Sequence, residues 1–256
     1  MSATELNNDQ LNRYSRHLLL PEIDLTGQAR LSQARAVIIG AGGLGSPVAM
    51  YLASSGVGHI TIFDDDNVDL GNLQRQIAFT NNDIEKNKAQ CLRNTLLALN
   101  PEIEVEAICH RADTTQLRQI TKNTDVLIDC CDNFTSRFSI NQTSIDSKTP
   151  LVSGAAIRFQ GQVAVFDPRT NNAPCYQCLY NEDEPAQEQQ TCRDRGVFAP
   201  LVGIIGSIQA AEALKVILNI GKPLTSKLLT IDTLSMSLRQ LKLSKDPACP
   251  TCGSNK

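Results

Sequence analysis

Ala36-Val-Ile-Ile-Gly-Ala-Gly-Gly-Leu-Gly45 places a short apolar run directly before a loop in which most residues are glycine. The run 36–39 predicts a buried parallel strand, and the pattern of 44–54 is helical, so the glycines occupy a strand-to-helix turn. Without Cβ atoms in the loop, a phosphate can approach the backbone N–H groups at the positive end of the helix. The loop therefore predicts a nucleotide site, with a turn tightened for helix–strand packing as the alternative.

A second apolar run, 59–63, ends at Asp64, where a dinucleotide fold places the acid that binds ribose hydroxyls. Further strand-like runs alternate with helical stretches, which is the rhythm of a parallel sheet covered by helices. The expected strands are 104–108, 125–129 and 150–153, and the expected helices are 86–99, 114–120 and 134–145. The fold class is therefore α/β, with a Rossmann-like, doubly wound, mainly parallel sheet.

The two ends of the chain depart from this rhythm. Asp9 is the expected cap of a first helix that runs to Leu19, within a helical arm over 1–33. After a strand at 162–166, the polar and acidic stretch 181–190 predicts a mobile loop. A long apolar helix at 202–218 and a late pair of strands, expected to be antiparallel, follow at 227–231 and 236–241. Because no linker of domain-boundary quality interrupts the chain, we expect one domain over 1–256.

Composition limits the classes of function. The chain has 256 residues, is 41% hydrophobic and carries a net charge of −3, so it can bury a large core and offers no nucleic-acid surface. We find neither a stretch of about 18 apolar residues nor a charged-then-apolar leader, and so expect no membrane association and a cytoplasmic location.

Nine cysteines in a reducing compartment favour metal binding over disulfides. Two C-x-x-C pairs, Cys175 with Cys178 and Cys249 with Cys252, supply four thiolates, the tetrahedral number for structural Zn²⁺. Their separation of about 70 residues requires distant segments to meet in a zinc-linked part over 175–253. A reactive dithiol is the alternative. A metal held by four thiolates has no open position for substrate, so the chemistry must lie elsewhere.

The segment 64–76 is the richest in chemistry-bearing side chains. It offers acids for ribose, followed by Asn72, Arg75 and Gln76, which suit a polyphosphate. The glycine loop lacks the Gly-Lys-Ser/Thr of a P-loop, so the cations for the outer phosphates must come from elsewhere, and Arg75 and Lys88 are the candidates. A solvated charged loop is the alternative.

Asp132 and Asn133 follow the strand that ends at Asp129, at the edge where the carboxyl ends of parallel strands form a ligand crevice. A carboxylate there could hold Mg²⁺ against a triphosphate. Alternatively, either residue caps the next helix, or the two divide these tasks.

Several motifs in one order carry a specific resemblance. They are Gly40-Ala-Gly-Gly-Leu-Gly45, Asn72-Leu-Gln-Arg-Gln76, Asp129-Cys-Cys-Asp-Asn133, Ser153-Gly-Ala-Ala-Ile-Arg158 and both C-x-x-C pairs. Together they resemble the MoeB/ThiF/HesA family of sulfur-carrier adenylyltransferases, bacterial relatives of ubiquitin-activating enzymes. The resemblance runs from about Gln10 to Gly253.

The resemblance implies adenylation, with ATP and Mg²⁺, of the C-terminal glycine of a small ubiquitin-like sulfur-carrier protein that ends in Gly-Gly. It assigns Gly43 and Asp64 to the nucleotide, Asn72, Arg75 and Lys88 to phosphates, Asp132 to Mg²⁺, and the four paired cysteines to zinc. It implies further nucleotide contacts from Asp66, Gly71, Leu73, Gln74 and Asn133. Arg16 of the first helix is expected to enter the site of a neighbouring subunit, which implies a homodimer.

Two branches of the family compete. The stretches 153–161 and 199–209 resemble the molybdopterin-synthase branch, whereas Cys192-Arg193 resembles the cysteine site of the thiamine branch. Neighbouring arginines favour a reactive thiolate at Cys192, but a non-essential cysteine on a loop fits as well. No rhodanese-like extension follows Cys252, so we expect a separate sulfur-donor protein. Two other classes stay open: an NAD-dependent oxidoreductase and a catalytically silent nucleotide-binding scaffold.

Overall fold

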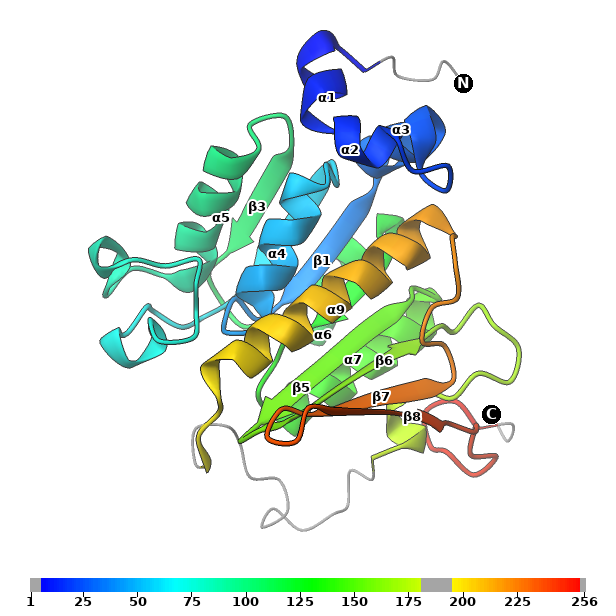
Figure 1. Cartoon of the computed structure of the whole chain (residues 1–256). Helices are drawn as coiled ribbons and strands as arrows, with labels where there is room; N and C mark the ends of the chain where they lie inside the picture. The colour runs from blue at the N-terminus through cyan, green and yellow to red at the C-terminus, as the bar shows by residue number, and fades with distance from the viewer. Residues whose placement is uncertain (1–5, 181–194, 254–256) are drawn as a thin grey trace.

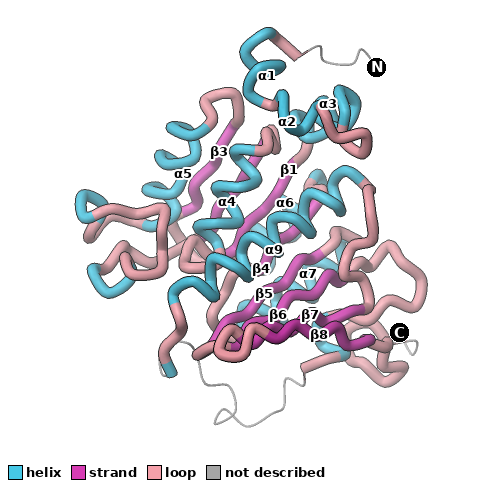
Figure 2. Tube along the Cα trace, in the orientation of Figure 1, coloured by secondary structure: helices cyan, strands magenta, loops and turns pink. Residues whose placement is uncertain are grey.

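One mixed sheet organises the computed structural model, which describes residues 6–180 and 195–253 (Figures 1 and 2). Its strands lie in the order β3-β2-β1-β4-β5-β6-β7-β8. Neighbours from β3 to β5 are parallel and those from β5 to β8 antiparallel. The strands are β1 (Arg35–Ile39), β2 (His59–Phe63), β3 (Glu104–Ile108), β4 (Val126–Asp129), β5 (Leu151–Ile157), β6 (Gln160–Phe166), β7 (Lys227–Asp232) and β8 (Ser237–Lys242).

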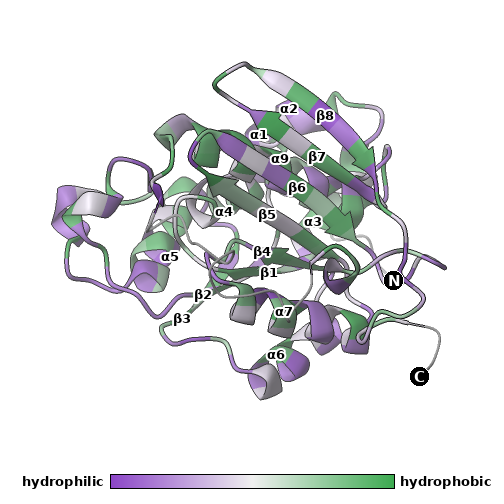
Figure 3. Cartoon of the chain, turned by 90° about the horizontal axis from the view of Figure 1, so that it is seen from below, coloured by the Kyte–Doolittle hydropathy of each residue, from purple (hydrophilic) through white to green (hydrophobic). Residues whose placement is uncertain are grey.

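Helices cover both faces of the parallel part (Figures 1 and 3). One face carries α4 (Gly45–Ser54), α5 (Lys88–Leu99) and α9 (Ala199–Leu218), and the other carries α6 (Thr114–Ile120) and α7 (Phe134–Ser147). Along β1, Ala36 and Ile38 pack into the first layer, whereas Val37 and Ile39 pack into the second. This alternation is why residues 36–39 of the strand are all apolar, and the doubly wound α/β prediction is confirmed.

The chain reverses direction across the sheet between β1 and β4. From β1 it moves outward to β2 and β3, then returns through β4 to β5 on the other side. The loops after β1 and β4 therefore diverge to opposite faces, which opens a crevice at the carboxyl ends of these strands.

The N-terminal arm differs from its prediction. Asn7, and not Asp9, caps α1 (Asn8–Arg13), because its side chain accepts from the Gln10 N–H in a capping box. The helix does not reach Leu19. It is interrupted at Tyr14, whose buried hydroxyl accepts a hydrogen bond from the Asn100 amide at 2.8 Å, and α2 (Ser15–Leu18) follows. A further helix, α3 (Asp24–Gln33), lies within the expected helical arm over 1–33, although the sequence did not indicate it as a separate element.

Two other expectations need correction. Strand β5 continues beyond Ser153 to Ile157, because it pairs with β6 over its whole length in an antiparallel hairpin. Helix α9 begins at Ala199 and is long and apolar enough to cross a membrane by length and composition, so the expectation of no such stretch was wrong. More than half of α9 is buried, and it packs on α3, α4 and β4–β6, as the core helix of a soluble protein would.

Candidate functional site

A cleft of about 1050 Å³ lies at the switch point of the sheet. Its first wall consists of the glycine loop, the segment after β2 and the turn after β4. Its second wall is the face of the antiparallel strands β5–β8. The cleft therefore joins two differently built ends, which we call the phosphate end and the sheet end.

The glycine loop adopts a form that requires glycine. Gly40 has a φ of 100°, and a Cβ there would lie 2.7 Å from the carbonyl oxygen of Cys130; one on Gly45 would lie 1.9 Å from the Gly40 carbonyl. The backbone N–H groups of Gly42, Gly43 and Leu44 donate no hydrogen bond to any acceptor within the described residues. Because they precede the first turn of α4, these N–H groups form an anion site at the phosphate end.

Asp64 holds this loop against the end of β2. One carboxylate oxygen accepts from the Ala41 N–H at 2.7 Å and the other from the Asp66 N–H at 2.9 Å. Burial raises the pKa of Asp64 despite these N–H groups and the charge of Lys88. Each carboxylate oxygen has a second lone pair that could accept a hydrogen bond from a ribose hydroxyl. That role of Asp64 stays a prediction.

Lys88 and Asp66 form a pair of unequal burial. The Lys88 ammonium lies 2.8 Å from the Asp66 carboxylate, and the side chains are 7% and 41% exposed. Lys88 is the first residue of α5, the helix end at which a cation is disfavoured. A buried cation in this place, facing a cleft, is poised for an anionic ligand.

Only some residues of the segment 71–76 line the cleft. Asn72, Arg75 and Gln76 line the cleft, and the Arg75 guanidinium donates to the Gly71 carbonyl at 3.0 Å. Gly71, Leu73 and Gln74 are not on its lining: Leu73 packs against the core and Gln74 is exposed. Any contact of these three with nucleotide stays a prediction.

Asp132 and Asn133 divide their tasks. The Asn133 side chain accepts from the Ser136 N–H at 2.9 Å and caps α7. Asp132 is exposed on the cleft lining. The structure thus confirms the capping role for Asn133 and places Asp132 on the cleft lining, while binding of Mg²⁺ by Asp132 stays a prediction.

Sequence reasoning missed a buried ion pair whose arginine, Arg137, is part of the cleft lining. Arg137 of α7 lies 3.3 Å from the Asp129 carboxylate at the end of β4 and donates to the carbonyls of Cys131 and Gly154. Ser153 donates to the same carboxylate at 2.7 Å. Burial by itself would lower the pKa of Arg137, but the Asp129 charge outweighs it and the net shift is upward. The network ties the ends of β4 and β5 together, and no local sequence pattern links its members.

The sheet end of the cleft was also missed. Two cross-strand rows of side chains form its floor, each contributed by one residue from β5, β6, β7 and β8. The rows are Ala155-Gln162-Thr230-Arg239 and Ile157-Gln160-Asp232-Ser237. Amide, hydroxyl and charged groups alternate along this floor, which suits the backbone of an extended peptide. Only strand pairing brings these residues together.

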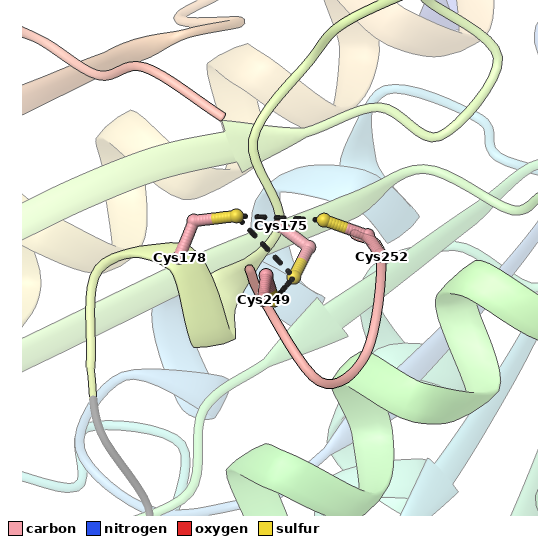
Figure 4. Close-up of side chains that lie close together, drawn as sticks. All are labelled: Cys175, Cys178, Cys249 and Cys252. Atoms are coloured by element: carbon pink, nitrogen blue, oxygen red, sulfur yellow. Dashed lines mark hydrogen bonds between the residues drawn. The ribbon is translucent and has the colours of Figure 1, made fainter. Parts of the chain in front are cut away.

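The four paired cysteines converge, as Figure 4 shows. Their Sγ atoms all lie within 4.8 Å of one another, and the separations of hydrogen-bonded pairs are 3.4 to 3.9 Å. A tetrahedral Zn²⁺ with bonds of about 2.3 Å sets its sulfurs about 3.8 Å apart, so the cluster fits zinc. Burial raises the pKa of the Cys175 thiol, so a metal that binds this cluster would have to displace the proton from that sulfur.

The cysteine cluster is connected to the cleft wall. Tyr176, which lies between Cys175 and Cys178 in a short 3-10 helix, lines the cleft. Asn141 of α7 accepts from the Tyr176 N–H at 2.9 Å and donates to the Cys175 sulfur at 3.6 Å. A metal in the cluster would therefore hold one side of the sheet end in place.

The structure describes only one of the two remaining predicted residues. Arg16 is exposed on α2 and does not line the cleft of its own chain. Cys192 and Arg193, like the expected mobile loop, lie outside the described residues.

Comparisons with known proteins agree with the motifs. Residues 14–251 match the ThiF family. The chain is 42% identical to the sulfur carrier protein adenylyltransferase of Thermus thermophilus, over 96% of this chain and 92% of that protein. It is 39% identical to the molybdopterin-synthase adenylyltransferase of Escherichia coli, over 97% and 99%, and 40% identical to the sulfur carrier protein ThiS adenylyltransferase of Escherichia coli, over 98% of each.

A solved structure extends the likeness. The crystal structure of Escherichia coli MccB with ATP superposes with a TM-score of 0.81 at 26% identity, covering 98% of this chain and 75% of that one. The predicted family, fold class and enzyme class are confirmed, whereas identities of 39% and 40% do not separate the two branches. The chain belongs to the ThiF family and is a nucleotidyltransferase of the adenylyltransferase kind.

Proposed function

We propose that this protein uses ATP to adenylate the C-terminal glycine carboxylate of a small ubiquitin-like sulfur-carrier protein and releases pyrophosphate. Two relatives, at 42% and 40% identity, are named as adenylyltransferases of a sulfur carrier protein, and a third, at 39%, is named as a molybdopterin-synthase adenylyltransferase. These names support a sulfur-carrier protein as the substrate. The observation that carries the proposal is one cleft that joins a cation-lined phosphate end to a floor suited to a peptide tail.

The proposed reaction requires no general base. A carboxylate is already ionised at pH 7, so its oxygen attacks the α-phosphorus directly, a P–O bond forms, and the bond to the pyrophosphate oxygen breaks. Alignment and charge neutralisation are the tasks left to the protein. Arg75 and Lys88, both on the cleft lining, supply positive charge for the leaving pyrophosphate.

Magnesium is part of the proposal. Asp132 presents an exposed carboxylate to the cleft, and carboxylate oxygens are ligands that Mg²⁺ accepts. Bound there, the cation would neutralise charge that develops on the phosphates. Asp132 would hold it from the protein side, while Asn133 is occupied as the cap of α7.

The body of the carrier needs a surface beside the sheet end. The β7–β8 hairpin exposes Leu234, Met236, Leu238 and Leu241, which are between 51% and 74% exposed. These apolar side chains adjoin the strands that form the floor of the cleft. A carrier docked on the hairpin could lay its Gly-Gly tail along that floor, where the absence of side chains on glycine permits close approach.

We propose structural zinc in the cysteine cluster, with no part in the chemistry. Four thiolates complete a tetrahedral shell, so a bound ion would have no open position for substrate.

We propose a homodimer because the N-terminal arm exposes apolar side chains. Leu19 and Leu25 are 71% and 57% exposed, and Arg16 lies on the same arm, away from its own cleft. If Arg16 completes a partner's site, then mixing Arg16→Ala with Asp132→Ala under exchange conditions should restore about a quarter of the activity, because heterodimers contain one intact site. Two inactive variants that stay inactive after mixing would contradict the arrangement.

We favour the molybdopterin branch, on the motifs at 153–161 and 199–209, with a separate protein as sulfur donor and the cytoplasm as location. The thiamine branch is the second candidate, and it rests on Cys192. Reconstitution with both carriers distinguishes them, since the cognate carrier should be adenylated at far lower concentration.

The test of the proposed function is pyrophosphate exchange into ATP. Exchange that requires a carrier ending in Gly-Gly is expected, and a carrier lacking its last glycine should give none. No exchange with any carrier, together with tight ATP binding, would favour a silent scaffold. Nicotinamide absorbance serves as the control for an oxidoreductase, a class that none of the relatives' names supports.

A further inference from the structure

Asn141 occupies a position that disfavours asparagine. It lies within α7, and its side chain is 1% exposed. Asparagine is a poor helix former because its amide competes with the backbone for hydrogen bonds, and a buried amide destabilises the fold unless it is hydrogen-bonded. Both hydrogen bonds that the structure gives this amide lead to the segment that carries the cysteine cluster. The cluster therefore accounts for an asparagine at this place.

The two bonds fix the direction of the Asn141 amide. Its Nδ2 atom donates to the Cys175 Sγ atom at 3.6 Å, and its Oδ1 atom accepts from the Tyr176 backbone N–H at 2.9 Å. A backbone N–H can only donate, so it holds the amide oxygen on its own side and leaves the NH₂ group toward the sulfur. Asn141 thus presents a donor, and not an acceptor, to Cys175.

The sulfur that receives this bond lies deep in the cluster. Cys175 is 1% exposed and Cys249 is 4% exposed, whereas Cys178 and Cys252 are partly exposed. Four thiolates around one divalent cation leave an excess of negative charge, which is costly in a buried place unless hydrogen bonds compensate it. The Asp246 backbone N–H donates to the Cys178 sulfur at 3.4 Å. Asn141 supplies the corresponding bond, from a side chain, to the most buried sulfur.

Helix α7 holds Asn141 in register with the cleft. Asn133, Arg137 and Asn141 follow one another at intervals of four residues, a spacing that puts side chains on one face of a helix. Asn133 caps the helix beside the cleft, and Arg137 binds the ends of β4 and β5. Because the same rigid element carries all three, the donor to Cys175 is placed before any metal binds.

We infer that Asn141 is an outer-shell residue of the metal centre, whose NH₂ group donates to the thiolate of Cys175 when a metal is bound. A hydrogen bond to a thiolate stabilises its charge, and an outer-shell partner also fixes the orientation of the ligand that it contacts. Asn141 is therefore a positioning residue that raises the affinity of the cluster for metal. The inference rests on the proposed zinc, but it requires neither ATP nor a carrier.

The experiment measures metal affinity in two variants. Asn141→Leu has a side chain of similar shape and removes both hydrogen bonds. Asn141→Asp keeps an acceptor for the Tyr176 N–H, which favours folding, but has no N–H group for the sulfur. Competition between the zinc-loaded protein and a chromogenic chelator should give a Kd for zinc that is about tenfold higher or more in both variants.

Asn100→Leu is the matched control for folding. Asn100 is also fully buried, and its amide donates to the Tyr14 hydroxyl and the Ala53 carbonyl, which belong to the N-terminal arm and α4. The control should lower the melting temperature, because it leaves these groups unpaired, and should not change the Kd for zinc. A Kd that rises as much in Asn100→Leu as in the Asn141 variants would trace the effect to general stability and overturn the inference.

Cobalt provides a spectroscopic readout that a purely structural asparagine would not change. With Co²⁺ in the cluster, the sulfur-to-metal charge-transfer band of both Asn141 variants should move to longer wavelength, because a thiolate without its hydrogen bond gives up an electron more easily. A folded Asn141 variant with the wild-type Kd and the wild-type band would overturn the inference and leave the zinc proposal intact. Wild type that binds no zinc would overturn the zinc proposal and this inference with it.

Discussion

The two ends of the cleft are built by different rules. At the phosphate end, the glycine loop, Asp64 and Lys88 follow strands or begin helices of the parallel part, so short stretches of chain position them. At the sheet end, Gln162, Thr230 and Arg239 become neighbours only through pairing of β6, β7 and β8. The backbone thus prepares one end for an anion, while side chains of several strands form the other.

This difference suggests a division of labour. Fixed N–H groups and cations at the phosphate end favour charge neutralisation in a reaction. An open polar floor beside exposed apolar side chains favours recognition of a protein tail. Damage to the phosphate end should therefore reduce chemistry in a folded protein, whereas damage behind the sheet end should reduce stability first.

The largest effect is expected behind the sheet end. Cys249→Ser removes one of four thiolates and should abolish stoichiometric zinc and lower the free energy of unfolding by more than about 4 kcal/mol. The protein that remains folded should retain most of its exchange activity. Metal analysis and chemical denaturation measure both quantities, with exposed Cys109→Ser as the control. A wild-type protein purified without zinc would show that no metal in the cysteine cluster stabilises the sheet end.

The next effect concerns the junction of the two ends. Arg137→Met leaves the buried Asp129 carboxylate unpaired and should destabilise the fold by about 3–5 kcal/mol. Arg118→Met, which breaks the exposed pair with Asp146, should cost about 1 kcal/mol or less. Adding Asp129→Asn to Arg137→Met should recover part of the loss, because no unpaired charge then remains. A double variant less stable than Arg137→Met alone would show that packing dominates there.

The same contrast explains what the sequence could predict. The strand 59–63, the helix 114–120 and the glycine turn each carry their signal within a few residues, and the structure has them where the sequence placed them. The end of the first helix could not be predicted, because Tyr14 interrupts it to meet Asn100, far along the chain. Arg137 and the sheet floor were invisible for the same reason, since their partners are set by tertiary contacts.

Arg75→Ala tests the phosphate end directly. Removing a charge that neutralises the leaving pyrophosphate should reduce carrier-dependent exchange by about 100-fold or more. Stability should change little, because Arg75 is partly exposed and, among the described residues, its guanidinium donates a hydrogen bond to the Gly71 carbonyl alone. Arg118→Ala is the matched control. Near-normal exchange by a folded Arg75→Ala protein would show that charge for the outer phosphates comes from elsewhere.

The smallest effect on adenylation is expected at Cys192. Adenylation uses the carboxylate, ATP and Mg²⁺, so Cys192→Ala should leave exchange nearly unchanged. Thiocarboxylate formation then separates the branches. In the molybdopterin branch an external donor attacks the acyl-adenylate, AMP leaves, and the variant keeps its yield. In the thiamine branch a persulfide formed on Cys192 by the donor attacks instead, and an acyl disulfide holds the carrier until a thiol reductant breaks the S–S bond. We expect the first outcome, and a reductant-sensitive conjugate mapped to Cys192 by mass spectrometry would contradict it and favour the thiamine branch.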